Sequence, residues 1–312
     1  MTRFFPLLLA LIIAACAQQA AQVVQEPASY TVASKVVTLP SDRRSSIPVS
    51  VYYPQGATGP LPVVLFSTGA FSSPEKYEAL LKPWAQAGFA ILAPLHVDSE
   101  RWEGPRPAAR SEGLAWRRLD FLAAAGAESM IEQSIGADLD LSRVVAAGHS
   151  FGGLIAQVLG GAQPGPMAGT VGRGTPFEVV ALLAVSPPGP IPTYIEADGW
   201  AMMSAPQLLT TGTADIVPQM APQWDAHLGG HRAHLGESWA LVQADVDHYF
   251  GNVIGRTEYP GPAQQAQFDE MVIISTDFIT AYLRGSDQAM ARFKAAPKGT
   301  FSPDSQPALL RR

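Results

Sequence analysis

One short segment constrains the fold of this 312-residue chain more than any other. The apolar stretch Arg143–Ala147 runs into the sequence GHSFGG at 148–153, and a second apolar run follows at 154–159. This order predicts a strand, a tight turn and a helix, with glycines where the turn leaves no room for side chains. Such a turn presents the Ser150 hydroxyl to solvent and aims the Phe151 backbone N–H at a developing oxyanion. The alternative is a glycine-rich turn without catalytic use.

Strand-like apolar runs alternate with helix-length segments along the rest of the chain. About eight runs are expected to be strands: Tyr30–Leu39, Ile47–Tyr53, Pro62–Phe66, Ala90–Ala93, Arg143–Ala147, Val179–Val185, Gln207–Thr211 and Trp239–Gln243. Helices are expected at Glu75–Ala87, which Ser73 would cap, and at Ala108–Ala125, Gly152–Leu159 and Gln264–Leu283. The alternation predicts an α/β fold, a mainly parallel sheet covered by helices on both faces.

Composition excludes several classes of protein. Apolar residues make up 47% of the chain and charged residues 15%, so the chain can bury a large core and is not expected to be disordered. The net charge of −6 offers no basic surface for nucleic acid. A single cysteine excludes an intramolecular disulfide framework and a multi-cysteine metal site.

The N-terminus has the pattern of an export signal. Arg3 precedes an apolar run at 4–15, which is shorter than the ~20 residues that a membrane-spanning helix needs. The run ends in IAAC at 13–16, which resembles a bacterial lipobox and implies cleavage before Cys16 and lipidation of its thiol. By resemblance to Gram-negative lipoproteins, Ala17 after the cysteine favours the outer membrane, with the protein facing the periplasm or the surface. An ordinary secretory signal, with Cys16 incidental, is the alternative.

No internal repeat and no second block of domain size are apparent in the sequence. We expect a signal peptide at 1–15, a tether at 16–28, one domain at 29–287 and a C-terminal tail at 288–312.

The GHSFGG motif, in its strand–turn–helix setting, resembles the nucleophile elbow of α/β-hydrolases. It is similar to the elbows of platelet-activating-factor acetylhydrolase-like and dienelactone-hydrolase-like esterases, and the resemblance covers about residues 45–285. It implies an α/β-hydrolase fold with eight strands and Ser150 as nucleophile. Dienelactone hydrolases usually carry a cysteine at this position, so the serine favours ester hydrolysis.

The chain order of such enzymes places an acid after a late strand, and a histidine after the acid. The segment 212–218 follows the strand Gln207–Thr211 and resembles the acid loop of the family, which implies Asp215 as the acid. Asp198 and Glu196, after the preceding strand, are the alternatives.

Position selects the general base among the six histidines. His248 follows the strand Trp239–Gln243 and comes after Asp215, as the chain order requires. The other histidines fit less well. His149 lies inside the elbow with its side chain expected to point away from Ser150, and His96 precedes the nucleophile.

Three further histidines, His227, His231 and His234, lie in a polar segment that we expect to be a solvated loop. A metal site there is the weaker interpretation, because Gly229 and Gly230 interrupt a helical face and no further ligand follows at a suitable spacing. We therefore expect no metal and no cofactor.

The predicted mechanism is acyl transfer. His248 takes the Ser150 proton, Ser150 attacks an ester carbonyl, and Asp215 orients the imidazole. Phe151 N–H is one oxyanion donor, and the resemblance implies Ala70 N–H as the second. Phe71 is the alternative donor, because this chain has Thr68-Gly69 where the family usually has His-Gly.

Several large apolar residues flank loops that would meet at the carboxyl edge of the sheet: Phe71, Phe151, Trp200, Met202, Met203, Tyr249 and Phe250. The span from Val185 to Gln207 is too short for a large cap, so we expect an open site for esters with short-chain or small aromatic acyl groups. The alternatives are a phospholipid acetylhydrolase, a polyester hydrolase and a non-catalytic binding lipoprotein with this fold.

Overall fold

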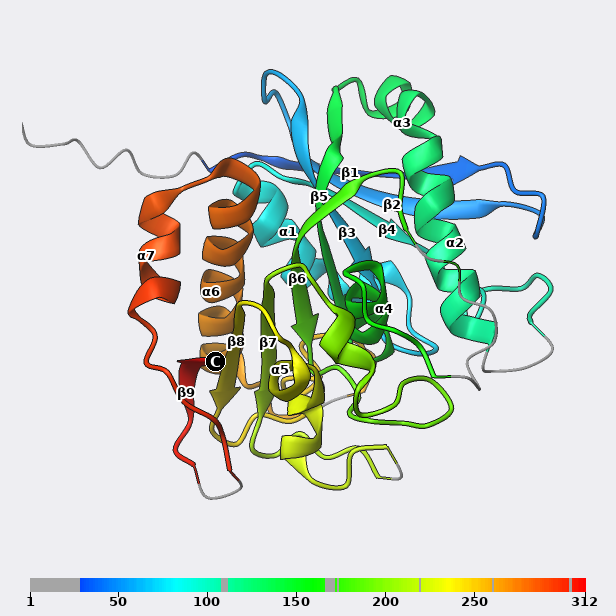
Figure 1. Ribbon diagram of the computed structural model, residues 1–312. Helices are drawn as coiled ribbons and strands as arrows, with labels where there is room; N and C mark the ends of the chain where they lie inside the picture. Colours follow the sequence, from blue (N-terminus) through cyan, green and yellow to red (C-terminus); the bar gives the residue numbers. More distant parts are fainter. Residues whose placement is uncertain are drawn as a thin grey trace, which may run out of the picture.

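A nine-stranded mixed sheet forms the centre of the molecule, with strand order β1-β2-β4-β3-β5-β6-β7-β8-β9 (Figure 1). The computed structural model describes residues 29–107, 112–165, 172, 174–218, 220–259, 261–302 and 305–312. The strands are β1 (Val32–Leu39), β2 (Ile47–Pro54), β3 (Leu61–Ser67), β4 (Ala90–Pro94), β5 (Leu139–His149), β6 (Glu178–Val185), β7 (Gln207–Gly212), β8 (Ser238–Gln243) and β9 (Ala308–Arg311). The six strands from β4 to β8 pair in parallel, and the remaining pairings are antiparallel.

Helices cover both faces of this sheet, as Figure 1 shows. They are α1 (Glu78–Gln86), α2 (Gly113–Gly126), α3 (Glu128–Ile135), α4 (Phe151–Leu159), α5 (Gly229–Ala233), α6 (Gln265–Arg284) and α7 (Asp287–Ala295), with the 3₁₀ turns η1 (Pro74–Tyr77), η4 (Gly199–Met202) and η5 (Trp224–Leu228). Helices α1 and α6 contribute to one large buried cluster, and α2, α3 and α4 contribute to a second; a smaller third cluster includes Leu209, Trp224 and Phe301. The predicted α/β-hydrolase fold is confirmed.

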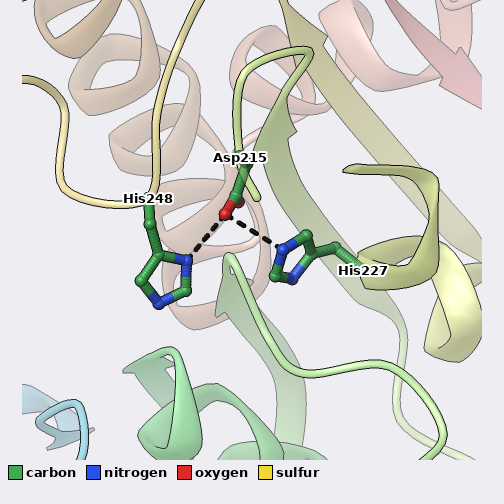
Figure 2. A group of neighbouring side chains, drawn as sticks. All are labelled: Asp215, His227 and His248. Atoms are coloured by element: carbon green, nitrogen blue, oxygen red, sulfur yellow. Dashed lines mark hydrogen bonds and ion pairs between the residues drawn. The ribbon is translucent and has the colours of Figure 1, made fainter. Parts of the chain in front are cut away.

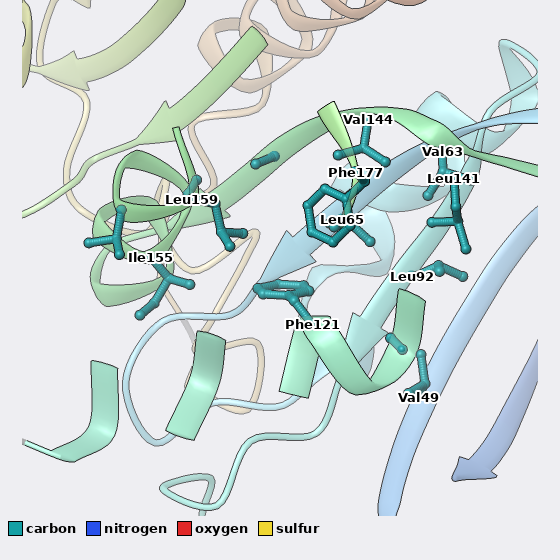
Figure 3. Packing of buried hydrophobic residues seen from close by; sticks show 14 of the residues in the cluster. Val49, Val63, Leu65, Leu92, Phe121, Leu141, Val144, Ile155, Leu159 and Phe177 are labelled. Carbon is teal, nitrogen blue, oxygen red and sulfur yellow. The ribbon is translucent and has the colours of Figure 1, made fainter. Parts of the chain in front are cut away.

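The side chains of β3 show how the two clusters share one sheet. Val63 and Leu65 belong to the cluster under α2 and α4, whereas Val64 and Phe66 belong to the cluster under α1 and α6, and all four are fully buried. Successive strand side chains point to opposite faces, so a strand covered on both sides needs an unbroken apolar run. Figure 3 shows the cluster under α2 and α4, with Phe121 of α2 beside the sheet residues.

The C-terminal segment differs from the sequence expectation. The expected strands are all present, but β9 raises the count to nine, and it pairs with β8 inside the segment 288–312 that we expected to be a tail. Helix α7 places Phe293 in the core, with its ring centroid 5.6 Å from that of Trp239. The four-residue edge strand could not be predicted from this polar, proline-containing segment. Pairing with β8, rather than local apolar periodicity, defines the strand.

The entry into α1 also differs in detail. Ser73 is the N-cap residue, as predicted, but its hydroxyl donates to Glu75 Oε1 at 2.6 Å and caps no backbone N–H. The 3₁₀ turn η1 takes the place of the first helical turn. Between β6 and β7 the only helical element is η4, which agrees with the prediction that no large cap covers the site.

The predicted signal, tether and lipidated Cys16 lie outside the described residues. None of the helices in the described part of the chain combines the length and the apolar character needed to cross a bilayer.

Candidate active site

Ser150 occupies a strained turn between β5 and α4. Its backbone has φ 54° and ψ −123°, a conformation that L-residues rarely adopt. A Cβ on Gly148 would collide with the Gly152 carbonyl oxygen, and a Cβ on Gly152 would collide with that of Ser67. The glycines are therefore required because the turn is pressed against β3, which confirms the steric argument from the sequence.

Asp215 and His248 lie side by side although 33 residues separate them in the chain. Asp215 follows β7 and His248 follows β8, two adjacent parallel strands whose carboxyl ends meet at one edge of the sheet. His248 Nδ1 donates to Asp215 Oδ1 at 2.7 Å, which leaves Nε2 as the acceptor nitrogen. His248 and Ser150 line the same cavity of about 330 Å³. The structure thus brings together the three residues for which we predicted a catalytic role.

The alternative acids are placed elsewhere. Glu196 and Asp198 are exposed in the turn that precedes η4. The carboxylate that contacts His248 belongs to Asp215.

The Asp215 carboxylate is buried and accepts contacts from three side chains. Besides His248, the Thr211 hydroxyl donates to Oδ2 at 2.8 Å, and His227 Nε2 lies 3.0 Å from Oδ1 (Figure 2). The His227 contact lacks the alignment of a hydrogen bond, whereas the His248 contact has it. Burial alone would raise the pKa of Asp215, but the contacts from His227 and His248 outweigh it and hold the pKa well below its usual value. Asp215 is therefore ionised in the fold.

The segment with three histidines is not the solvated loop that we expected. His227, His231 and His234 are each no more than 1% exposed. Their partners differ: His227 Nδ1 bonds to the Pro187 carbonyl, His231 Nδ1 to Ser238 Oγ, and His234 Nε2 to the Ala205 carbonyl. These histidines do not converge on a common point as metal ligands would. Sequence alone suggests solvation because the partners that bury them come from other segments.

One group of three described residues, Asp215, His227 and His248, has the chemistry and spacing of metal ligands, with candidate atoms within 4.8 Å of one another. Within it, His248 Nδ1 already donates to Asp215 Oδ1 at 2.7 Å, and His227 Nε2 faces the same oxygen at 3.0 Å. We assign no metal ligand in this group.

The loop after β3 is held in place by Arg117 of α2. The buried Arg117 guanidinium donates to the Thr68 carbonyl, and to the Gly69 carbonyl at 3.1 Å. It also pairs with Asp98 at 2.6 Å, and the Asp98 carboxylate accepts the Phe71 N–H at 3.3 Å. Burial would raise the pKa of Asp98, but Arg117 lowers it to about 2.

These contacts discriminate between the two candidate oxyanion donors on the loop. The Phe71 N–H is engaged by Asp98. No residue in the described ranges accepts a hydrogen bond from the Ala70 N–H, and Ala70 and Ser150 line the same cavity. The geometry therefore favours Ala70 over Phe71, beside Phe151 at the N-terminus of α4.

His149 is fully buried, borders the Ser150 cavity and connects two loops of the site. The Tyr77 hydroxyl accepts the Gly69 N–H at 2.9 Å and donates to His149 Nδ1 at 2.9 Å. His149 Nε2–H then donates to the His248 carbonyl at 2.8 Å. Burial, helped by nearby His248, lowers the pKa of His149 to about 3, so the ring is neutral and these proton positions are fixed.

Only some of the large apolar residues that we expected near the site line it. Phe71 and Tyr249 line the Ser150 cavity, and Phe71 and Phe151 line a neighbouring apolar cavity of about 420 Å³. Trp200, Met203 and Phe250 are core residues, and Met202 borders a different cavity. Sequence reasoning missed Tyr77, Arg117 and His227, because the local sequence around each carries no sign of its distant partners.

Comparisons with known proteins agree with this architecture. Residues 20–188 match a protein-family model described as Chlorophyllase. A search of curated proteins finds no match. Among solved structures, the chain is similar to a "Putative Dienelactone Hydrolase" from Klebsiella pneumoniae subsp. pneumoniae MGH 78578, with a TM-score of 0.55 and 16% identity over 82% of this chain and 100% of that chain. That likeness confirms the fold. Because the family match covers more than half of the residues, the chain belongs to the chlorophyllase family of α/β-hydrolases.

Proposed function

We propose that this protein is a serine carboxylic-ester hydrolase that works through an acyl-enzyme on Ser150. The observation that carries the proposal is the 2.7 Å bond from His248 Nδ1 to Asp215, which leaves Nε2 basic, with Ser150 on the same cavity. His248 accepts the Ser150 proton as Oγ attacks the ester carbonyl, and then returns that proton to the departing alcohol. Water, activated in the same way, hydrolyses the acyl-enzyme and restores Ser150.

Two backbone N–H groups would stabilise the tetrahedral intermediate. Phe151 N–H lies at the N-terminus of α4, where the helix dipole favours negative charge. Ala70 N–H is the second donor, held by the contacts of its loop. A donor of this kind contributes about 2.7–4 kcal/mol of transition-state stabilisation in comparable sites.

The apolar cavity supports an apolar acyl group in the substrate. Its lining is mostly apolar, and Asp98 and Arg106 are the two charged residues in it: Ala70, Phe71, Asp98, Arg106, Pro107, Gly113, Phe151, Ile191, Tyr194 and Met220. His248 lines the Ser150 cavity instead, and the departing alcohol must lie near His248 to receive its proton. The acyl group therefore belongs in the apolar cavity, whose volume of about 420 Å³ suits a short-chain or small aromatic acyl group.

Charged groups surround the proposed alcohol side. Lys76 pairs with Glu258 at 2.8 Å, and the Arg256 guanidinium lies 4.5 Å from the centre of the Tyr249 ring. These residues line the Ser150 cavity and favour a polar alcohol.

Active-site labelling tests the proposal. The purified protein comprising residues 17–312 is treated with a fluorophosphonate, beside Ser150→Ala and the control Ser142→Ala, whose serine is exposed and bonds to Asp140. We expect labelling of wild type and S142A but not S150A, and turnover of p-nitrophenyl esters of short acyl chains. A folded wild type that neither reacts nor hydrolyses any ester would refute the enzyme hypothesis and favour a binding lipoprotein.

A substrate panel separates the finer alternatives. It contains a phospholipid with a short acyl chain, an aromatic polyester, and chlorophyll, after which the family is named. Preference for one of these over small esters would replace the small-ester hypothesis by the corresponding activity.

We also propose export and lipidation at Cys16, on the lipobox-like sequence at 13–16. In a Gram-negative host, the full chain is expected to incorporate labelled palmitate and to fractionate with the outer membrane. Cys16→Ser should lose both properties. Incorporation by the variant equal to wild type would contradict lipidation at this cysteine.

A further inference from the structure

An oxygen atom faces each ring nitrogen of His227. Nδ1 lies 2.7 Å from the Pro187 carbonyl oxygen, and Nε2 lies 3.0 Å from Asp215 Oδ1 (Figure 2). A carbonyl and an ionised carboxylate can only accept, whereas a neutral imidazole has one donor nitrogen and one acceptor. Both contacts are attractive only when His227 carries a proton on each nitrogen.

We propose that His227 is a protonated imidazolium that shares the Asp215 carboxylate with His248 and acts as a positioning residue for that base. This inference rests on the proposed function of Asp215 and His248. It adds a third member, with a fixed positive charge, to the pair that sequence order predicted.

The charged and titratable groups around His227 favour this state. Asp215 approaches from the loop after β7, and His248 approaches from the loop after β8 with its ring centroid 5.6 Å from that of His227. His149 of β5 is neutral because its pKa lies near 3. On the adjoining elements η5 and α5, Asp225 and Arg232 pair with each other at 3.0 Å. Asp215 is therefore the dominant charge that faces His227.

Burial and Asp215 act in opposite directions on His227. Burial would lower its pKa, but the contacts with Asp215 and with the Pro187 carbonyl outweigh burial and raise the pKa above the ordinary value. The charge is thus held in a site that is only 1% exposed.

The consequence for His248 is electrostatic. Protonation of His248 would place a second positive charge within about 6 Å of the first, with one carboxylate to balance both. Like charges at that separation disfavour each other's charged form. Removal of the His227 charge is therefore expected to change the acid limb of activity.

Two substitutions separate charge from hydrogen bonding. The Gln amide nitrogen of His227→Gln can take the place of Nε2 beside Asp215, and that of His227→Asn can take the place of Nδ1 beside Pro187. Both remove the charge. His231→Gln is the matched control, since His231 is equally buried in the same segment but bonds to Ser238 rather than Asp215.

The first readout is the pH dependence of fluorophosphonate labelling and of kcat/KM. We expect the acid limb to move to higher pH by about 0.5–1 unit in both H227Q and H227N, and to stay in place in H231Q. An unmoved limb in both His227 variants, or an equal shift in H231Q, would overturn the proposal.

The second readout does not depend on activity. Long-range ¹H–¹⁵N correlation spectra of the wild type at pH 7 should show protons on both ring nitrogens of His227. A single N–H on that ring would overturn the proposal even in an active enzyme. If labelling fails altogether while both N–H signals are present, the proposed catalytic function fails and the imidazolium assignment stands.

Discussion

The Tyr77 hydroxyl offers a direct test of how the oxyanion loop is held. It accepts the Gly69 N–H and donates to His149 Nδ1, each at 2.9 Å, and the side chain is fully buried. Tyr77→Phe retains the ring, whose centroid lies 5.1 Å from that of Phe66, so apolar packing is preserved. The substitution leaves two buried polar groups without a partner.

The expected losses follow from those two groups. An unsatisfied buried polar group costs about 1–3 kcal/mol, so two of them should lower the free energy of unfolding by about 2–6 kcal/mol. Gly69 precedes the proposed donor Ala70, and complete loss of a donor costs about 2.7–4 kcal/mol of transition-state stabilisation. A donor that is loosened rather than lost should lower kcat by about 10-fold and leave KM nearly unchanged.

Urea unfolding and ester kinetics measure both effects in the same preparations. Tyr282→Phe is the control, because its hydroxyl makes a long, 3.4 Å contact with exposed Glu237 and its loss should cost less than about 0.5 kcal/mol. If Y77F were as stable as Y282F, the hydrogen-bond reasoning would be wrong. If Y77F were destabilised with an unchanged kcat, the Tyr77 bond would not be what positions the Ala70 donor.

Three further predictions follow from the same structure. Gly152→Ala should lose at least about 2 kcal/mol of stability and most activity, because its Cβ would collide with the Ser67 carbonyl; a well-folded, active variant in urea titration and ester assay would contradict this. Burial lowers the pKa of His149 to about 3 and that of His231 to about 4. The unfolded state therefore binds more protons below about pH 6.5, and the free energy of unfolding should fall as the pH falls, by up to about 1.4 kcal/mol per unit for each histidine. Urea titrations at pH 7 and 5 measure that slope, and His231→Gln should reduce it; equal stability at both pH values would count against neutral burial. Gly113→Val fills the apolar cavity, since a Cβ there lies an unstrained 3.6 Å from Phe151, and should lower kcat/KM for long acyl esters more than for acetate esters. Equal losses across the chain-length series would place the acyl group elsewhere.

Parts of this protein follow from local rules and were predictable from its sequence. The β/α alternation and the two-sided burial of β3 appear as patterns of apolar residues along the chain. They can therefore be predicted without knowledge of tertiary contacts. The glycines around Ser150 reflect a steric requirement of one tight turn. Ser150, Asp215 and His248 each follow a parallel strand, and the carboxyl ends of parallel strands lie at one edge of the sheet. Their places in the chain therefore predict that they lie near one another.

Other features depend on partners that the sequence does not identify. The short edge strand β9 exists by pairing with β8, and the three histidines of 227–234 are buried by segments distant in sequence. The Tyr77–His149 bond spans 72 positions, and the Arg117–Gly69 bond spans 48. Polar side chains have no periodic signature that reveals a distant partner, because a hydrogen bond depends on final positions in space. Sequence determined the sheet, the elbow and the chain order of the site, whereas tertiary structure decided which N–H is free on the oxyanion loop and that Asp215 lies between two histidines.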